Sequence, residues 1–334
     1  MRNTLLYLLC LLFVGSLQGQ DLHYSQFYNS PINTNPGKTG IFNGDKRVAL
    51  SYKSQWRSVP VPWTTFSGSF DRKLYPKYND GHFFSAGVLF NYDVQGELAD
   101  INLTNINLAG SWTKVINEQN LFTIGAMIGY ATRGFDSRSL TWDSQWNGVE
   151  FDQNLSSNEV FDTERVSFVE NALGLNYRWQ RDKRTKLDLG VGAFHVIEPG
   201  VAFNSDDGTT LPRRISLTGV ASFQVTEKFD IQIDGLAQFQ GEYREAIIAG
   251  LGKFHVNQNR GKELEFHVGV GYRTKSIFPV VAVQHRQMYV AMNYDVDLTD
   301  FGNTTRDRNP TSFEVHFNYI ITDVKRKVKV CPIY

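Results

Sequence analysis

Apolar and polar residues alternate along most of this chain with the period of a β-strand. In residues 263–273 the even positions are apolar or aromatic, while the odd positions are charged, polar or glycine. The pattern returns between turn signals and predicts about fourteen strands. The expected strands are 46–54, 63–72, 82–93, 102–115, 120–135, 168–180, 184–197, 213–225, 227–240, 243–257, 262–275, 277–286, 287–297 and 311–324. No window after residue 20 has the period of a helix, so we expect an all-β fold.

Strand length and aromatic spacing favour a membrane barrel over a sandwich of two sheets. Most of the expected strands have ten to fourteen residues, whereas strands of globular proteins have about five or six. In residues 229–239, Phe229 and Phe239 bracket the apolar face, and Leu236 is the single apolar residue on the polar face. At ~3.3 Å per residue and a tilt of ~40°, the two phenylalanines are separated by about 25 Å of height, which is the apolar band of an outer-membrane barrel.

We therefore expect a closed antiparallel transmembrane β-barrel whose outer face contacts outer-membrane lipid, because open sheet edges cannot be satisfied in a bilayer. Pro279 cannot donate to a β-ladder, so it predicts a bulge or a strand end within 277–286.

We expect the barrel to cover residues 45–324, with two further segments before it and one after it. Residues 1–20 have the charge, the short apolar run and the small residues of a signal peptide. Residues 21–44 lack alternation but contain four aromatic residues. We expect them to pack against the periplasmic opening or partly inside the lumen, like a plug. Residues 325–334 form a basic tail, which is either a solvated end or a contact for a periplasmic partner through Lys325, Arg326, Lys327 and Lys329.

The longest connections between strands carry aromatic residues. If both ends of the processed chain lie in the periplasm, then 136–167, 198–212 and 298–310 are extracellular, as is 55–62. Aromatic side chains on outward loops either pack on one another as a lid or anchor a partner protein. The candidate partner-binding residues are Trp56, Trp142, Trp146, Phe151, Phe161 and Phe203.

Charge and motifs argue against nucleic-acid binding and against an enzyme. Lys+Arg and Asp+Glu number 34 each, so the chain has no general polyanion-binding character. It contains no Gly-x-Ser-x-Gly, His-Glu-x-x-His or Cys-x-x-Cys. His267 and His316 fall on polar faces, where a histidine lining the lumen is the simpler interpretation. We expect no cofactor, no metal and no catalytic site.

A clustered motif near the start of the processed chain resembles the opening of the PorP/SprF family of the type IX secretion system of Bacteroidota. That family begins with a His-aromatic-Ser-Gln-Phe-Tyr run and an Asn-Pro-x-x-x-Gly turn. The matching residues here are His23, Tyr24, Ser25, Gln26, Phe27 and Tyr28, then Asn35, Pro36 and Gly40. Further matches, from Arg47 to the closing "CPIY", spread the resemblance over almost the whole processed chain, and departures such as Lys38 and Thr39 are mild.

The resemblance implies a non-enzymatic barrel in the bacterial outer membrane. Some members of the family are paired with large secreted adhesins, in settings such as gliding motility, and help to export or hold them through their C-terminal signal domains. We expect this role, with the C-terminal domain of an adhesin-like protein as partner. Two alternatives stay open: a core secretion component linked to the periplasmic lipoprotein ring of the motor, and a small-solute diffusion channel.

Overall fold

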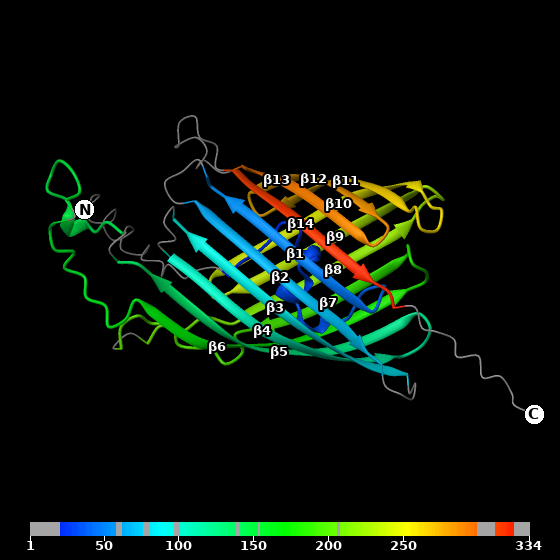
Figure 1. Ribbon diagram of the computed structural model, residues 1–334, viewed down its shortest axis with the longest axis horizontal. Coiled ribbons are helices and arrows are strands. Elements are labelled where there is room, and N and C mark those ends of the chain that lie inside the picture. Colours follow the sequence, from blue (N-terminus) through cyan, green and yellow to red (C-terminus); the bar gives the residue numbers. More distant parts are fainter. Residues whose placement is uncertain are drawn as a thin grey trace, which may run out of the picture.

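The alternating segments form a closed barrel in the computed structural model (Figure 1). The structure describes residues 21–57, 62–75, 81–96, 101–137, 140–152, 154–205, 208–298 and 311–323. Its strands are β1 (Lys46–Gln55), β2 (Trp63–Leu74), β3 (His82–Gln95), β4 (Ile101–Val115), β5 (Asn120–Phe135), β6 (Arg165–Gln180), β7 (Lys186–Phe194), β8 (Arg214–Gln224), β9 (Phe229–Gln240), β10 (Tyr243–Asn257), β11 (Leu264–Arg273), β12 (Ser276–His285), β13 (Met288–Asp297) and β14 (Thr311–Ile321). Each strand pairs antiparallel with the next, and β14 pairs with β1, so the sheet has no free edge. The expected closed antiparallel barrel is therefore confirmed.

The observed strand ends differ from the expected ones by at most three residues. One difference has a clear backbone cause: β7 ends at Phe194 because His195 has a φ of 53°, outside the strand region. The expectation for Pro279 was wrong. Its ladder to β13 is interrupted, but Ile277 and Val280 keep the same register on either side, so the residue makes neither a bulge nor a strand end.

Side chains alternate between the lumen and the outer wall, as the sequence pattern predicts. In β9, Ile231 and Ile233 face outward and are 38% and 48% exposed, whereas Asp230 and Asp234 face inward and are buried. Leu236, the exception in this pattern, is also inward and buried. It packs in an apolar cluster with a phenylalanine from the N-terminal segment, so the break in alternation marks a contact inside the barrel.

The two ends of the barrel differ in the length of their connections. The long connections 136–164 and 195–213 leave the end at the left of Figure 1, and we call this the long-loop end. The opposite end, called the turn end, has short turns such as 225–228 and 286–287. Bacterial barrels place long loops outside the cell and short turns in the periplasm, which assigns the two ends.

No helix long and apolar enough to cross a membrane occurs among the residues that the structure describes. The expected signal peptide, 1–20, and the basic tail, 325–334, lie outside those residues.

Candidate functional site: the lumen plug and the long-loop end

Residues 21–44, which we call the plug, run through the inside of the barrel. They form three short 3-10 helices, η2 (Phe27–Asn29), η3 (Pro31–Asn33) and η4 (Pro36–Lys38), visible in dark blue between the strands of Figure 1. From residue 24 to residue 42 every side chain except that of Tyr28 is buried. Helix η2 contacts β1 and β14, while η4 contacts β4 to β7, so the plug touches opposite walls of the barrel.

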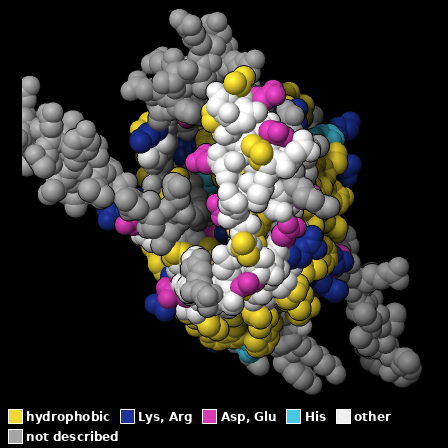
Figure 2. All heavy atoms as spheres, turned by 90° about the vertical axis from the view of Figure 1, so that its left-hand side faces the viewer, with side chains coloured by type: hydrophobic (Ala, Val, Ile, Leu, Met, Phe, Trp, Pro, Cys, Tyr) yellow, Lys and Arg dark blue, Asp and Glu magenta, His cyan; other side chains and the backbone are white. Residues whose placement is uncertain are grey.

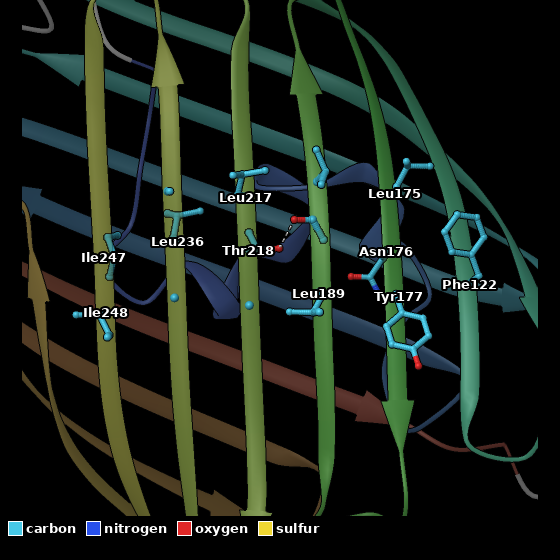
Figure 3. Close-up of a pocket in the computed structure, with 15 residues that line it drawn as sticks. Phe122, Leu175, Asn176, Tyr177, Leu189, Leu217, Thr218, Leu236, Ile247 and Ile248 are labelled. Carbon is cyan, nitrogen blue, oxygen red and sulfur yellow. Dashed lines mark hydrogen bonds between the residues drawn. The ribbon is translucent and has the colours of Figure 1, made fainter.

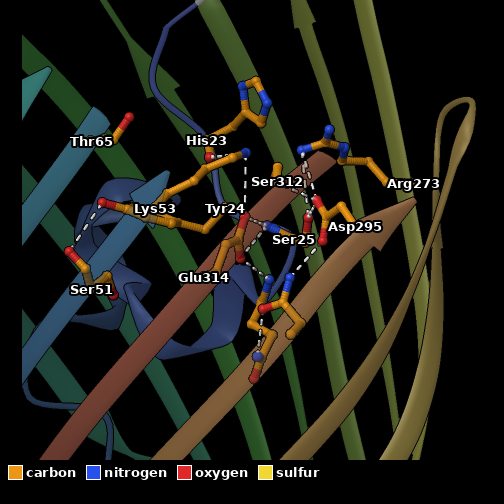
Figure 4. Close-up of polar contacts among 12 residues, drawn as sticks. His23, Tyr24, Ser25, Ser51, Lys53, Thr65, Arg273, Asp295, Ser312 and Glu314 are labelled. Atoms are coloured by element: carbon orange, nitrogen blue, oxygen red, sulfur yellow. Dashed lines mark hydrogen bonds and ion pairs between the residues drawn. The ribbon is translucent and has the colours of Figure 1, made fainter. Parts of the chain in front are cut away.

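The first half of the plug is anchored by a carboxylate on β14 (Figure 4). The backbone N–H groups of Ser25 and Gln26 donate to the Glu314 carboxylate at 2.9 and 3.3 Å. The Lys53 ammonium lies 3.3 Å from the same carboxylate and donates to the His23 carbonyl at 3.1 Å. Hydrogen bonds to a charged acceptor are about twice as strong as neutral ones, so a buried carboxylate is an effective clamp for this backbone.

The side chains of the same motif extend this contact around the wall. Ser25 Oγ donates to Asp295 at 2.6 Å, and Gln26 Nε2 donates to Asn293 at 2.7 Å. Phe27 enters an apolar cluster on the inner wall, whose members are Leu236, Ile247, Ala249, Leu251, Phe278 and Val280. The Tyr28 hydroxyl donates to Gln26 Oε1 at 3.0 Å. Each residue of this run therefore serves to seat the plug.

The second half of the plug is held by arginines that are also paired with wall carboxylates. Asp71 accepts from Gly40 N at 2.7 Å and from Arg47, which also donates to the Lys38 carbonyl at 3.2 Å. Across the lumen, Arg178 bonds to Asp188 at 2.6 Å and donates to the carbonyl of Ile41 at 3.2 Å. The ion pairs fix the arginines so that their remaining N–H groups meet the plug backbone.

The turn at Asn35 and Pro36 presses against inward-facing glycines of the wall. A Cβ atom added at Gly174 would lie 2.0 Å from Asn35 Oδ1, and one added at Gly125 would lie 2.4 Å from the Pro36 carbonyl oxygen. Asn35 Nδ2 donates to the carbonyl of Leu175 at 2.8 Å. These strand glycines thus allow close approach of the plug backbone to the wall.

The N-terminal end of the plug is held at the long-loop end, not at the turn end. Asp21 lies 2.6 Å from His195 Nε2 and 3.3 Å from Arg214 Nε, and its backbone N–H donates to Gln240. Burial alone would lower the pKa of His195, but the ion pairs with Asp21 and with Glu170 outweigh burial and raise that pKa to about 9. The plug therefore crosses the whole lumen, beyond the turn-end opening where its packing was one of the two expected arrangements. Residue 21 thus lies at the long-loop end, whereas the start of the processed chain was assumed to lie in the periplasm; the assignment of the two ends rests on the lengths of the connections.

The candidate aromatic residues divide into a packed group and an exposed pair. Phe161 and Phe203 both pack edge-on against Phe135, with ring centroids 4.8 Å apart in each case, and Trp142 lies 5.6 Å from Phe161. Trp142 and Phe161 also line a cleft of about 570 Å³. This packed group joins the two long loops above the barrel.

Trp146 and Phe151 form the exposed pair, at the outer part of the loop between β5 and β6. They face each other across an isolated β-bridge, with ring centroids 5.1 Å apart, and each is 49% exposed. Trp56 lies elsewhere, at the end of β1, where it packs edge-on against Trp63 at 5.6 Å. The basic residues Lys325, Arg326, Lys327 and Lys329 lie outside the described residues.

Several plug-anchoring residues were not found by the sequence argument. They are inward-facing charged residues of the strands, namely Lys53, Asp71, Arg178, Asp188, Asp295 and Glu314. The available signal was charge at polar-face positions within strands of an otherwise apolar barrel, since such charges need partners when they are buried.

The outer wall carries an apolar groove of about 650 Å³ across β5 to β10 (Figure 3). Gly219 and Gly235 face each other in the ladder and supply no side chain, while Leu189, Leu217 and Ile248 form the sides. Because these side chains belong to the outward set, the groove opens toward the bilayer.

A closed barrel with an apolar outer face, a polar buried lumen and a bound N-terminal plug defines an outer-membrane barrel protein. The family model described as "Type IX secretion system membrane protein PorP/SprF" matches residues 16–319, and the chain belongs to this family. Its location is the bacterial outer membrane. The resemblance seen in the N-terminal motif is confirmed.

Solved structures with a similar fold include two hydrocarbon transporters. The Ralstonia pickettii toluene transporter TbuX has a TM-score of 0.50 and 10% identity, with 88% of this chain and 94% of that chain covered. The P. putida toluene transporter TodX has a TM-score of 0.50 and 9% identity, with 89% and 95% covered. At such identities the likeness concerns the fold alone. No curated protein sequence matches this chain.

Proposed function

We propose that this protein is a non-enzymatic barrel of the type IX secretion system that binds the C-terminal domain of a secreted, adhesin-like protein at its long-loop end. The observation that carries the proposal is the exposed apolar surface on the loop between β5 and β6, which we call the loop surface. It consists of Trp146, Val149, Phe151 and Val160, of which Val149 and Val160 are 84% and 80% exposed. Exposed aromatic and aliphatic side chains gathered on one loop are typical of a protein interface.

The charges around the loop surface indicate the chemistry of a matching partner. Acidic residues surround it in sequence, namely Asp143, Glu150, Asp152 and Glu159. Figure 2, which faces the long-loop end, shows acidic and hydrophobic side chains interspersed on the projecting lobe. A partner with an apolar centre and basic residues at its rim would complement this pattern, because opposite potentials at an interface rim speed association and exclude wrong partners.

The presence of the plug favours a docking function over the function of a channel for free diffusion of solutes. Hydrogen bonds and ion pairs hold it along the lumen from Asp21 at the long-loop end to Phe42, whose carbonyl accepts from Lys73 at the turn end. A pore obstructed by buried, bonded backbone leaves the external loops as the surface available to a large partner.

The proposal is tested by truncating the two exposed aromatics. The double variant Trp146→Ala/Phe151→Ala should assemble normally, because neither residue belongs to a barrel strand. Its affinity for the purified C-terminal domain of a protein exported by the same cell should fall about 30-fold or more, corresponding to ~2 kcal/mol for a hot spot. Isothermal titration calorimetry with each such domain measures this loss.

Ile116→Ala is the matched control, since Ile116 is 58% exposed but lies at the turn end. Unchanged affinity in the double variant, or an equal loss in the control, would remove the loop surface as the docking site. Capture of a periplasmic ring lipoprotein, combined with normal export by the double variant, would instead favour the core-component role.

A further inference from the structure

Four lysine side chains on the inside of the barrel have no carboxylate within 4.0 Å among the described residues. One of them, Lys73, donates to the carbonyl of Phe42 at 2.6 Å, and the other three are Lys38, Lys186 and Lys253. Lys38 belongs to the plug, Lys186 is the first residue of β7, and Lys253 lies four residues before the end of β10. Lys186 and Lys253 face the lumen and are half-buried, while Lys38 is buried. Within the part of the chain that the structure describes, none of the three ammonium groups lies within 4.0 Å of a carboxylate, and Lys186 makes no hydrogen bond through its side chain.

The inward arginines near the same end of the barrel are different, because each has a carboxylate partner. The pairs are Arg47 with Asp71, Arg178 with Asp188, and Arg184 with Asp230. The unpaired state is thus particular to the lysines and is not a general property of this part of the wall.

The three lysines converge on one small area of the inner wall. Lys253 Nζ lies 3.4 Å from Ser222 Oγ, and Ser222 is the direct register partner of Lys186. On the other side Ser222 pairs with Gln232, which donates to both oxygens of Asp234 at 2.9 and 2.8 Å.

Lys38 approaches from the centre of the lumen. Its ammonium lies 5.9 Å from the ring centroid of Phe27, and that ring packs with Leu236 and Leu251 of the same strands, β9 and β10.

The charges in this area do not balance. The carboxylates that act on these three ammonium groups are Asp188, Asp230, Asp234 and Glu265. Asp188 and Asp230 are already paired with Arg178 and Arg184, so two carboxylates remain for three lysines and one positive charge is left over (3 − 2 = 1). Unpaired charge away from bulk water is costly unless a counter-charge or ordered water is supplied. None of these four carboxylates lies within 4.0 Å of the three ammonium groups in the described part of the chain, so the arrangement favours an anion from outside the chain.

We propose that Lys38, Lys186, Lys253 and Ser222 form a binding site for a small polyvalent anion that carries carboxylate or phosphate groups and enters from the turn end. The position of Lys186 at the start of β7 places the site close to the turn-end opening. Lysine ammoniums act as point charges with several donors and therefore suit multiply charged oxyanions better than chloride. The Ser222 hydroxyl adds a neutral donor between the two strand lysines.

The test measures anion binding to the full-length purified barrel in uncharged detergent. Citrate and inorganic phosphate are added separately at constant ionic strength set with sodium chloride, and binding is followed by thermal unfolding and by calorimetry. We expect at least one of the two anions to raise the unfolding temperature saturably. In the Lys186→Gln/Lys253→Gln variant its dissociation constant should rise roughly tenfold or more, because each substitution removes a charge in contact with the ligand.

Two variants serve as controls. Lys262→Gln removes an exposed turn-end lysine and should leave the dissociation constant unchanged. Lys186→Arg/Lys253→Arg keeps both charges and should retain most of the binding. If neither anion binds the native barrel, or if binding survives in the Lys186→Gln/Lys253→Gln variant, the site is overturned. A response to citrate alone identifies a carboxylate ligand, and a response to phosphate alone identifies a phosphate ligand.

Discussion

Replacing Glu314 with Gln should loosen the plug without opening the barrel. The Glu314 carboxylate is fully buried, accepts from the backbone N–H groups of Ser25 and Gln26, and lies 3.3 Å from the Lys53 ammonium. Glutamine keeps the shape of the side chain and one acceptor oxygen, but it removes the charge that strengthens both backbone hydrogen bonds.

The expected loss of free energy has two parts, one for docking of the plug and one for the stability of the barrel wall. A hydrogen bond to a charged group contributes about 1.5–3 kcal/mol, compared with about 1 kcal/mol for a neutral one. Weakening the bonds to Ser25 and Gln26 should therefore cost the docked plug about 2 kcal/mol. Since 1.4 kcal/mol is a factor of ten, the undocked population should rise about 30-fold. Lys53 lies on β1 and loses its partner whether or not the plug is docked, so that further cost falls on the barrel.

Hydrogen exchange measures this change at the residues concerned. The amide protons of Ser25 and Gln26 should exchange about 30-fold faster in Glu314→Gln, while those in the centre of β9 stay protected. Glu263→Gln, a change directly before β11 at the turn end, is the matched control and should leave plug exchange unaltered. Unchanged protection at Ser25 and Gln26 in a properly folded Glu314→Gln barrel would refute the role assigned to this carboxylate.

Three further predictions concern the wall, the long-loop end and the lumen. Val268→Arg, on the outer wall of β11, should destabilise the barrel by about 2–4 kcal/mol if the residue lies near the midplane of the bilayer. Val256→Arg, near the end of β10, should cost about 0–1 kcal/mol. Equal costs of the two substitutions, measured by urea unfolding from lipid vesicles, would contradict the membrane assignment. Because the pKa of His195 is raised from 6.5 to about 9, its contribution to stability is complete below pH 6.5 and is lost as the pH rises through 9. The imidazole titration measured by NMR should show this value in the native chain and a much lower one in Asp21→Asn, and a native value near 6.5 would exclude the proposed ion pair. Deleting residues 21–40 should raise the conductance in planar bilayers, and an unchanged current would show that the plug does not obstruct the lumen.

Much of the barrel follows from the sequence because each strand carries its own signal. Alternation in 229–239 is dictated by lipid on one side and a polar lumen on the other, and neither depends on which strand lies next to it. Strand length is set in the same way by the thickness of the bilayer. The predicted positions of strand ends were less accurate where the backbone conformation of a single residue ends the strand, as at His195.

The contacts of the plug could not be predicted from local patterns. Ser25 and Glu314 are separated by 289 residues, and their hydrogen bond exists only because closure of the barrel brings β14 next to β1. The one local sign was Leu236, whose apolar side chain on a polar face packs in the cluster that contains Phe27. The packing of the loop aromatic residues could not be predicted either, because Phe135 at the end of β5 contacts Phe203, which belongs to a loop much later in the chain.

The central claim is that this barrel holds a secreted protein at the cell surface, and deletion of its gene tests that claim most directly. Quantitative proteomics of the cell surface would compare the native strain, the deletion strain, and deletion strains complemented with the native chain or with Trp146→Ala/Phe151→Ala. We expect at least one exported protein with a C-terminal secretion domain to leave the surface on deletion. The native chain should restore it, whereas the double variant should restore it only weakly. If every exported protein stays at the surface in normal amounts after deletion, the docking function is wrong.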